Sequence, residues 1–267
     1  MKTTLLTPET DENAVKTAAE LIRAGEVVGM PTETVYGLAA NALNGEAVKK
    51  IFLAKGRPQD NPLIVHIADF EQIYDLCPAV PPQAKQLADA FWPGPLTMIV
   101  PKGGCIPDEV SCGLDTVGIR LPSHPMARAL IRESGVPLAA PSANTSGRPS
   151  TTTAAHVMHD MDGKIAAVLD GGACGVGVES TVITLALERP RLLRPGGITL
   201  EQLRSVLGEV DVDRALYEKI GDDVSVGARH EIPALCAESA RGGRAAIHRT
   251  RQVHCSAYQG LHRRTVL

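Results

Sequence analysis

Short apolar runs alternate with amphipathic segments along most of this chain, and this alternation constrains the fold more than any other feature. Helical spacing, often closed by a glycine or proline, predicts helices at 11–24, 46–54, 82–91, 126–133 and 199–207. Short, mostly apolar runs predict strands at 27–30, 63–67, 96–100, 117–121, 138–140, 166–169, 181–185 and 192–194. We therefore expect an α/β protein with one twisted mixed sheet, covered on at least one face by helices.

Length and composition favour one main globular unit. The chain has 267 residues, 44% of them hydrophobic and 21% charged, which suffices for one substantial core and a small appendage. The first 12 residues lack the apolar centre of a signal peptide, and no run approaches the roughly 20 apolar residues of a membrane helix. We expect a cytoplasmic protein. Its six cysteines show no C-x-x-C spacing, which favours isolated thiols over a zinc site.

The net charge of −3 conceals an uneven distribution. Residues 228–267 contain seven Arg, no Lys and two Glu, with four of the eight His, whereas residues 1–227 hold 20 basic and 28 acidic residues. A basic tail of this kind is often read as a nucleic-acid-binding segment.

Three turn-rich stretches combine hydroxyls, amides and cations, and each adjoins an apolar run. In the first, residues 31–38 (P-T-E-T-V-Y-G-L), alternation predicts that Thr32, Thr34 and Tyr36 share one face of an extended segment. Glu33 would then take the other face. A polar edge strand explains this pattern equally well.

The second stretch, residues 55–62 (K-G-R-P-Q-D-N-P), places Lys55 and Arg57 just after a predicted helix. Two cations there can simply bind the last helix carbonyls. Asn61 and His66 follow near the same sheet edge and favour a ligand site, although a histidine on an apolar strand is more often structural than catalytic.

The third stretch, residues 141–150, lies between a predicted strand and a helix that we expect to begin near Thr152. Gly147 lets its backbone turn tightly, and clustered backbone N–H groups at a helix start bind phosphate readily. An ordinary capped loop would explain Thr152 but not five polar side chains around one glycine: Ser142, Asn144, Thr145, Ser146 and Ser150.

Two arginines, Arg120 and Arg194, lie within apolar strands. A buried guanidinium needs a partner, and a ligand carboxylate or phosphate would suit its geometry. A glycine-rich run leading to Glu179 and Ser180 is a weak signal by itself. The sequence has no dinucleotide fingerprint, Walker lysine motif, H-E-x-x-H or nucleophile elbow. Residue chemistry alone therefore predicts an anion-binding cleft.

Together these segments resemble the YrdC/Sua5 family of threonylcarbamoyl-AMP synthases. The resemblance is carried, in order, by P-T-E-T-V-Y-G-L at 31–38, K-G-R-P-x-x-N-P-L at 55–63, His66, P-G-P-L-T at 93–97, V-G-I-R-L-P at 117–122, P-S-A-N-x-S-G at 141–147, E-S-T-V at 179–182 and R-P-G at 194–196. It implies a YrdC-like twisted sheet around a large electropositive cavity. It also implies a nucleotidyltransferase that makes threonylcarbamoyl-AMP and pyrophosphate from L-threonine, bicarbonate and ATP, for the t6A modification of tRNA.

The resemblance also implies site residues by position. The implied threonine site consists of Thr34, His66, Arg120, Ala140 and Ser180, with Arg120 as partner of the amino-acid carboxylate. The implied ATP site consists of Arg57, Asn61, Thr116, Ser142, Ser150 and Arg194, and the implied catalytic cations are Lys55 and Arg57. No metal ligands are implied, and Mg²⁺ is expected to enter with ATP. Because the threonine carbamate itself would attack the α-phosphorus, the protein would contribute positioning and charge neutralisation.

The family has a long form, in which a linker resembling P-G-M-K-Y-R-H-Y-A-P-K-A-P closes over the nucleotide. Residues 228–241 can be encoded by codons that give this string when read one base out of register. We therefore interpret 1–210 as the catalytic domain, 211–227 as the start of the linker and 228–267 as a disordered tail in the wrong frame. Loss of the linker would impair activity.

Two alternatives remain. One is a non-catalytic module that binds tRNA or double-stranded RNA through the cavity and the tail. The other is a domain of a larger maturation protein, although the chain lacks the zinc-finger cysteines of such proteins. The main interpretation implies the three small substrates and a downstream t6A transferase complex as partners, with tRNA as an optional partner and no membrane.

Overall fold

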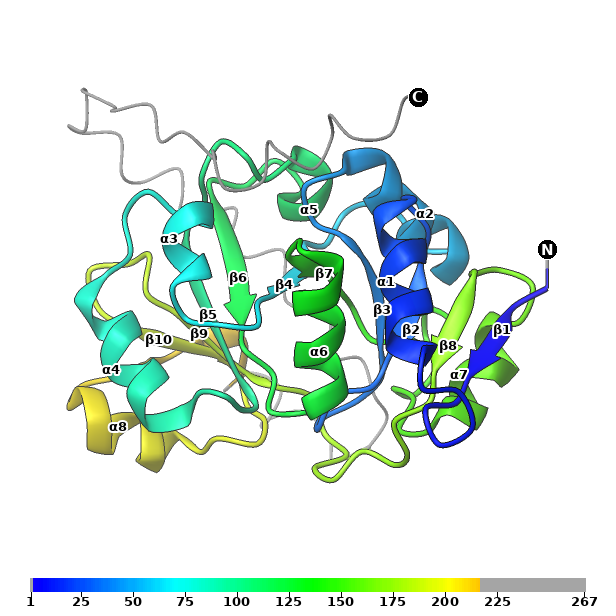
Figure 1. The fold of residues 1–267 in the computed structure, drawn as a ribbon. Coiled ribbons are helices and arrows are strands. Elements are labelled where there is room, and N and C mark those ends of the chain that lie inside the picture. The colour runs from blue at the N-terminus through cyan, green and yellow to red at the C-terminus, as the bar shows by residue number, and fades with distance from the viewer. Residues whose placement is uncertain (1, 217–267) are drawn as a thin grey trace.

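A single mixed sheet organises residues 2–216, the part of the chain that the computed structural model describes (Figure 1). Its strands are β1 (Thr4–Leu6), β2 (Val28–Met30), β3 (Gly37–Asn41), β4 (Ile64–His66), β5 (Leu96–Pro101), β6 (Thr116–Arg120), β7 (Leu138–Ala139), β8 (Ala167–Leu169), β9 (Thr181–Thr184), β10 (Arg191–Arg194) and β11 (Asp211–Val212). The helices are α1 (Ala14–Arg23), α2 (Gly45–Lys55), α3 (Gln72–Leu76), α4 (Pro82–Phe91), α5 (Asp108–Ser111), α6 (Pro125–Ser134), α7 (Ala154–Met161) and α8 (Leu200–Leu207).

The strand order is β1-β8-β2-β3-β7-β4-β6-β5-β9-β10-β11. Five neighbouring pairs are parallel (β1 with β8, β8 with β2, β4 with β6, β5 with β9, β10 with β11) and the other five are antiparallel, which makes the sheet mixed as predicted. Strands that are distant in sequence become neighbours, since β4 lies between β7 and β6, and β5 lies between β6 and β9. The polar loops of the sequence thereby meet at the middle of the sheet.

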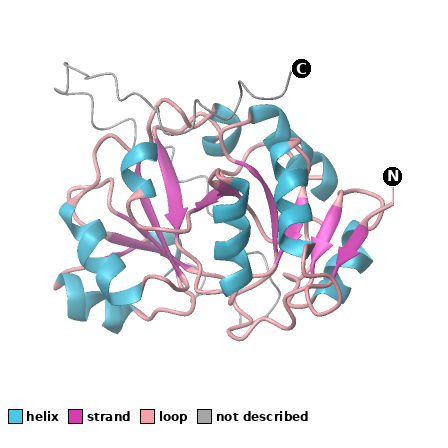
Figure 2. Ribbon diagram, viewed as in Figure 1, coloured by secondary structure: helices cyan, strands magenta, loops and turns pink. Residues whose placement is uncertain are grey.

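Helices cover the sheet in two groups, as Figure 2 shows. Helices α1 and α6 lie side by side and form one core with Val28, Met30 and Ala39. The remaining helices contribute to a second, larger core on the opposite face, where β3 presents Leu38 and Ala40. The two-residue period of β3 thus sends its side chains into the two cores alternately.

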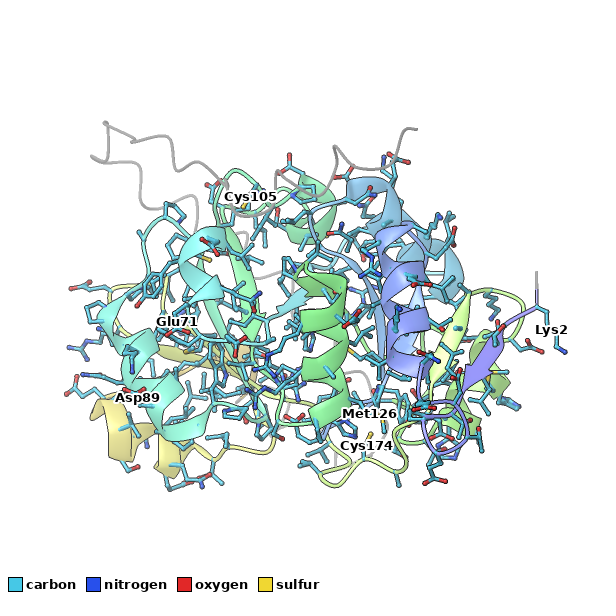
Figure 3. All side chains as sticks on the ribbon, in the orientation of Figure 1. Lys2, Glu71, Asp89, Cys105, Met126 and Cys174 are labelled. Atoms are coloured by element: carbon cyan, nitrogen blue, oxygen red, sulfur yellow. The ribbon has the colours of Figure 1, made fainter. Side chains whose placement is uncertain are left out.

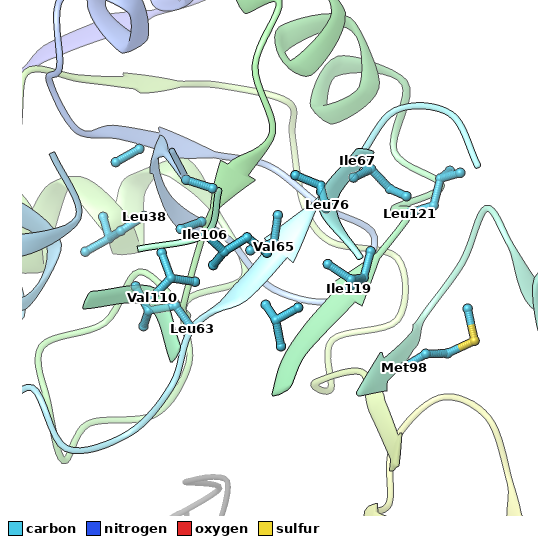
Figure 4. Packing of buried hydrophobic residues seen from close by; sticks show 14 of the residues in the cluster. Leu38, Leu63, Val65, Ile67, Leu76, Met98, Ile106, Val110, Ile119 and Leu121 are labelled. Carbon is cyan, nitrogen blue, oxygen red and sulfur yellow. The ribbon is translucent and has the colours of Figure 1, made fainter. Parts of the chain in front are cut away.

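The larger core fills the space behind the central strands (Figure 4). Val65 on β4 is paired in register with Ile119 on β6, which is paired in turn with Met98 on β5. All three side chains are fully buried. The next residue along each strand must therefore point to the other face, and one such neighbour from each strand, namely His66, Arg120 and Thr97, belongs to the polar site described below.

Local signals explain where the main helices begin and end. Asn44 caps α2 by accepting the N–H groups of Glu46 and Ala47, and Gly56 ends it in the left-handed region (φ +62°). Thr199 and Gln202 form a reciprocal capping box at the start of α8. These signals are readable in the sequence, which is why the predicted helix bounds agree closely with the structure.

Every helix and strand predicted from the sequence is confirmed. The sequence did not predict β1, β3, α3, α5 or β11, which are short or contain little apolar periodicity. Strand β11 pairs with β10 and carries the sheet just past the predicted domain boundary at residue 210. The predicted tail at 228–267 and most of the predicted linker lie outside the described residues.

The cysteines of the described part are free thiols. Cys105 and Cys174 lie at opposite ends of the molecule in Figure 3, so these two cannot pair. Within residues 2–216 no helix combines the length and apolarity needed to cross a bilayer.

Candidate active site

A row of buried polar side chains crosses three neighbouring strands. His66 on β4 is paired in register with Arg120 on β6, and Arg120 with Thr97 on β5. Register partners point to the same face, so these side chains lie next to one another. Thr97 Oγ1 lies 2.8 Å from the hydroxyl of Ser180, which immediately precedes β9. The sheet therefore positions four polar groups on the face opposite the larger core.

Arg120 is buried, and a carboxylate of the protein balances its charge. Its Nη2 donates to Glu33 Oε1 over 2.5 Å, and its Nη1 donates to Thr34 Oγ1 over 2.9 Å. The second carboxylate oxygen of Glu33 accepts the N–H of Ser123 at 3.1 Å. A guanidinium has five N–H groups, and Nε reaches the carbonyl of Gly94 at 3.4 Å. Within the described part of the chain, two N–H groups of Arg120 therefore have no partner and are available to a ligand.

The segment that delivers Glu33 and Thr34 is a turn, so the predicted extended segment is wrong. Thr32 Oγ1 accepts the N–H groups of Thr34 and Val35 and donates to the carbonyl of Val35. Tyr36 does not join these hydroxyls, because its own donates to the carbonyl of Gly172 over 2.7 Å. Hydrogen bonds from a threonine to its neighbouring backbone compete with strand pairing, which an alternation argument ignores.

Arg194, at the end of β10, forms the second buried ion pair. Its Nη1 donates to Glu179 Oε2 over 2.5 Å, and its Nε and Nη2 donate to the carbonyl of Ser180 over 3.0 and 2.9 Å. Glu179 Oε1 accepts the hydroxyl of Ser150 over 2.9 Å. Burial lowers the pKa of Arg194, and the adjacent Glu179 opposes this shift. The structure thus gives both arginines protein carboxylates as partners, which the sequence did not reveal.

These groups line a cavity of about 80 Å³, named the inner cavity from here on. It brings together all five residues predicted for threonine, namely Thr34, His66, Arg120, Ala140 and Ser180. It also includes four of those predicted for ATP, namely Arg57, Asn61, Ser142 and Arg194. Residues that are up to 160 positions apart in sequence therefore share one small space.

Two buried polar atoms of residues lining the inner cavity have no hydrogen-bond partner among the described residues. They are Nδ1 of His66 and Oδ1 of Asn61. Burial, reinforced by the charge of Arg120, lowers the pKa of His66 to about 3, so the ring is neutral at physiological pH. Unpartnered buried polar atoms are uncommon in proteins, and a ligand in the cavity would explain both.

Lys55, the last residue of α2, is almost completely buried. Its Nζ donates to the carbonyl of Ser142 and, over 2.7 Å, to that of Asn144. It therefore ties the end of α2 to the loop after β7 and does not bind its own helix carbonyls. Burial, with a contribution from the charge of Arg57, lowers the pKa of Lys55 to about 7.

A second cavity of about 500 Å³, named the outer cavity, adjoins the first. The two share Val35, Arg57, Ser142 and Glu179 in their walls. Three cations line the outer cavity, namely Lys55, Arg57 and Arg148, together with the predicted Ser150. Thr116 lines neither cavity, because it lies at the end of β6 remote from Arg120. The structure thus groups the predicted ATP residues with the exception of Thr116.

The loop at 141–150 forms one wall of the outer cavity and is held by its own contacts. The side-chain amide of Asn144 donates to the carbonyls of Thr145 and Arg148, over 2.9 and 2.7 Å. Asp160 on α7 accepts from the N–H of Thr145 and from Arg148. The cap of α7 is Thr153, one residue beyond the predicted start.

Three further residues belong to the site but were not predicted from the sequence, namely Glu33, Thr97 and Glu179. Each lies inside a quoted motif, so the motifs located the residues without indicating their contacts. Two of them are carboxylates that neutralise the predicted arginines, and such pairing could have been suspected from the burial that the apolar strands imply. Within residues 2–216 no cluster of three His, Cys, Asp or Glu residues is suited to hold a metal ion.

The fold and the site together define a family. The family model described as "Telomere recombination", which covers the Sua5, YciO and YrdC proteins, matches residues 20–196. The chain therefore belongs to the Sua5–YciO–YrdC family, and the resemblance read from the motifs is confirmed.

Curated relatives carry a consistent name. The chain is 56% identical over 225 residues to the "Threonylcarbamoyl-AMP synthase" of Bacillus subtilis, a match that covers 83% of this chain and 64% of the relative. It is 51% identical over 227 residues to the protein of the same name from Pyrococcus abyssi, covering 84% and 67%. The chain thus spans about two thirds of the length of these relatives.

Solved structures agree with the fold. The structure titled "Crystal structure of P. abyssi Sua5 complexed with L-threonine" superposes with a TM-score of 0.79 at 48% identity, covering 86% of this chain and 69% of that one. Escherichia coli YciO superposes with a TM-score of 0.68 at 22% identity and supports the fold alone.

Proposed function

We propose that this protein is a threonylcarbamoyl-AMP synthase, which makes threonylcarbamoyl-AMP and pyrophosphate from L-threonine, bicarbonate and ATP. The observation that carries the proposal is the pair of adjoining cavities with a shared wall. One is small and lined by buried hydrogen-bonding groups, and the other is larger and lined by cations. The curated names and the threonine complex of the Pyrococcus relative support the same activity.

The inner cavity has the groups that an amino acid needs. Arg120 has two unused N–H groups for a carboxylate, a pairing for which guanidinium geometry is well suited. The neutral ring of His66 can accept a hydrogen bond from an amine or a hydroxyl. Thr34 and Ser180 line the same space, and Ala140 contributes an apolar surface. These five residues form the proposed threonine site.

The outer cavity has the charge that a triphosphate needs. Lys55 and Arg57 line it, and no carboxylate among the described residues lies within ion-pairing distance of either. Ser142, Ser150, Asn61 and Arg194 surround the junction with the inner cavity. We therefore propose that Lys55 and Arg57 act as the catalytic cations and that the other groups position the nucleotide. The negative charge of a bound triphosphate would raise the pKa of Lys55 from its value of about 7 and so favour the charged amine.

The proposed reaction needs no nucleophilic side chain. The threonine amine would attack the carbon of bicarbonate, and loss of water would leave a carbamate. The carbamate oxygen would then attack the α-phosphorus at the junction of the two cavities, and the bond to the β-phosphate would break, with pyrophosphate leaving into the outer cavity. Cations at that junction would neutralise the developing charge. We expect Mg²⁺ to enter as part of the MgATP substrate, bound by phosphate oxygens rather than by a resident set of protein ligands.

We further propose that the product serves a transferase complex that modifies tRNA. The proposed domain division (1–210, 211–227 and 228–267) and the frame interpretation of the tail are tested directly by reading the gene. Codons that cannot yield the linker string in the shifted frame would remove the interpretation. A protein with the frame restored should then show the higher activity of the two.

The experiment that tests the activity follows labelled carbon. The purified protein is incubated with ¹³C-bicarbonate, threonine and MgATP, and the nucleotide products are resolved by mass spectrometry. We expect a threonyl-carbamoyl adenylate that carries the label and is lost when threonine is omitted. Absence of any adenylate or AMP product, together with steeply salt-dependent tRNA binding that needs no threonine, would favour the RNA-binding alternative.

A further inference from the structure

Glu179 is the only carboxylate that lines either cavity within the described part of the chain. It faces both cavities from the wall that they share, and its side chain is 16% exposed. Five cations line these spaces: Lys55, Arg57, Arg120, Arg148 and Arg194. An acidic group in an otherwise cationic site opposes the binding of an anion, so its position calls for an explanation.

Both oxygens of Glu179 are bound to groups that would hold a phosphate. Oε2 accepts from Arg194, and Oε1 accepts from the hydroxyl of Ser150. These two residues are among those proposed for ATP. The carboxylate thus occupies, with its own negative charge, the donors that an anionic ligand requires.

The backbone around this pair leaves it little freedom to adjust. A Cβ atom on Gly196 would lie 2.4 Å from the carbonyl oxygen of Glu179 and from the N–H of Thr181. The turn after Arg194 is therefore packed directly on the backbone of Glu179. Rearrangement of the pair must come from the side chain of Glu179, which borders the outer cavity.

The other buried pair differs in this respect. Glu33 binds Arg120 and the N–H of Ser123, but it lines neither cavity. Its carboxylate neutralises Arg120 from outside the inner cavity, and two N–H groups of Arg120 stay without a partner among the described residues. Glu33 therefore holds Arg120 in place, whereas Glu179 competes with a bound anion for the N–H donors of Arg194.

From these contacts we propose that Glu179 is a specificity-determining residue, an internal anion that only a strongly charged phosphate group displaces from Arg194 and Ser150. The inference rests on the proposed function for the identity of the ligand. It predicts that Glu179 weakens binding of every phosphate ligand and weakens the less charged ones relatively more. The return of Glu179 to Arg194 would also promote the release of pyrophosphate.

The test measures binding of metal-free inorganic pyrophosphate by isothermal titration calorimetry. Glu179→Gln keeps the shape and an acceptor for Ser150 but removes the charge, so we expect binding about tenfold to one-hundredfold tighter than in the unaltered protein. Glu26→Gln is the matched control, because it removes one negative charge from the exposed Glu26–Lys50 pair, which lines neither the inner nor the outer cavity. We expect the control to change the affinity less than twofold.

Glu179→Asp covers the case in which the glutamine variant fails to fold. Its shorter carboxylate cannot reach both Arg194 and Ser150, so a smaller increase in affinity is expected. Unchanged or weaker pyrophosphate binding in the folded variants would overturn the inference, since it would show that Glu179 only positions Arg194. Tighter pyrophosphate binding without any labelled adenylate would support the inference and contradict the proposed function.

Discussion

The inner and outer cavities share a wall but are built from different parts of the chain. The inner cavity is formed mostly by side chains on strands and directly before them, which strand register and buried hydrogen bonds hold in place. The outer cavity is formed mostly by the end of α2 and by two loops, at 142–150 and 177–179. The comparison shows that the sheet holds Arg120 and Arg194 in buried ion pairs, whereas the end of α2 and the loop after it present Lys55 and Arg57, which have no ion-pair partner among the described residues. This difference fits a small amino acid beside a flexible polyanion.

The two cavities also differ in how their charges are neutralised. Arg120 is paired with a carboxylate behind it, so its loss should damage the structure as well as binding. Among residues 2–216 the guanidinium of Arg57 has as partners the carbonyl of Asn61 and the ring of Phe52, so its loss should damage binding alone. The predictions below test this contrast in order of expected effect.

The largest effect is expected for Arg120→Ala. This change leaves Glu33 buried without its partner, and loss of one partner of a buried ion pair costs about 3–5 kcal/mol of the free energy of unfolding. Threonine binding should disappear. Urea denaturation provides the measurement, and the double variant R120M/E33Q should recover part of the lost stability. A loss below about 1 kcal/mol would show that the pair does not stabilise the inner cavity.

The next largest effect is expected for Arg57→Ala. Loss of one charge-assisted contact to a phosphate should weaken ATP binding about tenfold to one-hundredfold, with little change in stability. Calorimetric titration with ATP measures the affinity. Arg189→Ala is the control, since Arg189 forms an exposed pair with Glu209. If R57A lowered stability as much as R120A, the contrast between the cavities would not hold.

Lys55 should give stability a dependence on pH. Its pKa is about 7 in the folded protein and 10.5 as an ordinary lysine, so the unfolded chain binds more protons between these values. The cost of burying the charged amine is therefore complete below pH 7 and decreases as the pH rises toward 10.5. Unfolding of Lys55→Met measured from pH 7 to 9.5 should show a smaller increase in stability than the unaltered protein. Parallel curves for the two proteins would contradict a lowered pKa.

His66 should give no pH dependence to the inner cavity. Because its pKa is lowered to about 3, the ring stays neutral from pH 5 to 8, and threonine affinity should be constant over that range. Titration calorimetry at pH 5.5, 6.5 and 7.5 measures this directly. A decrease in affinity with a midpoint near 6.5 would indicate that the ring is solvated and not held in the buried position.

The smallest effect is expected for Lys85→Gln, which sets the baseline. Lys85 and Asp89 form an exposed pair on α4, no residue of which lines the inner or the outer cavity, and such pairs contribute less than about 1 kcal/mol. Urea denaturation should barely distinguish this variant from the unaltered protein. A loss of more than about 1 kcal/mol in the free energy of unfolding would mean that such measurements cannot distinguish the effects of variants in the two cavities from that of a surface change.

Much of the fold was predictable because its signals are local. Asn44 and Gly56 bound α2, Pro82 begins α4, and short apolar runs mark the central strands. Strand β3 was missed because Gly37 to Asn41 contains small residues buried on both sides, which leaves no alternation to detect. The turn before it was mispredicted because one threonine satisfies the local backbone.

The site was predictable only in part, and for a physical reason. Motifs predicted which loops contribute to a site, and the structure places His66, Arg120 and Ser180 in the lining of one cavity. The partners of the arginines were not predictable, since Glu33 lies 87 residues from Arg120 and meets it only through the sheet order. The burial of Lys55 likewise depends on a loop almost 90 residues away.

Pyrophosphate release is the measurement that tests the account most directly. The 267-residue protein is incubated with MgATP, and release is followed with threonine and bicarbonate added together, singly and not at all. If the two cavities form one active site, pyrophosphate release requires both threonine and bicarbonate, because the carbamate must form in the inner cavity before it can attack the nucleotide in the outer one. Release that is independent of threonine, or its absence while threonine and ATP both bind, would contradict the claim that the two cavities form one active site.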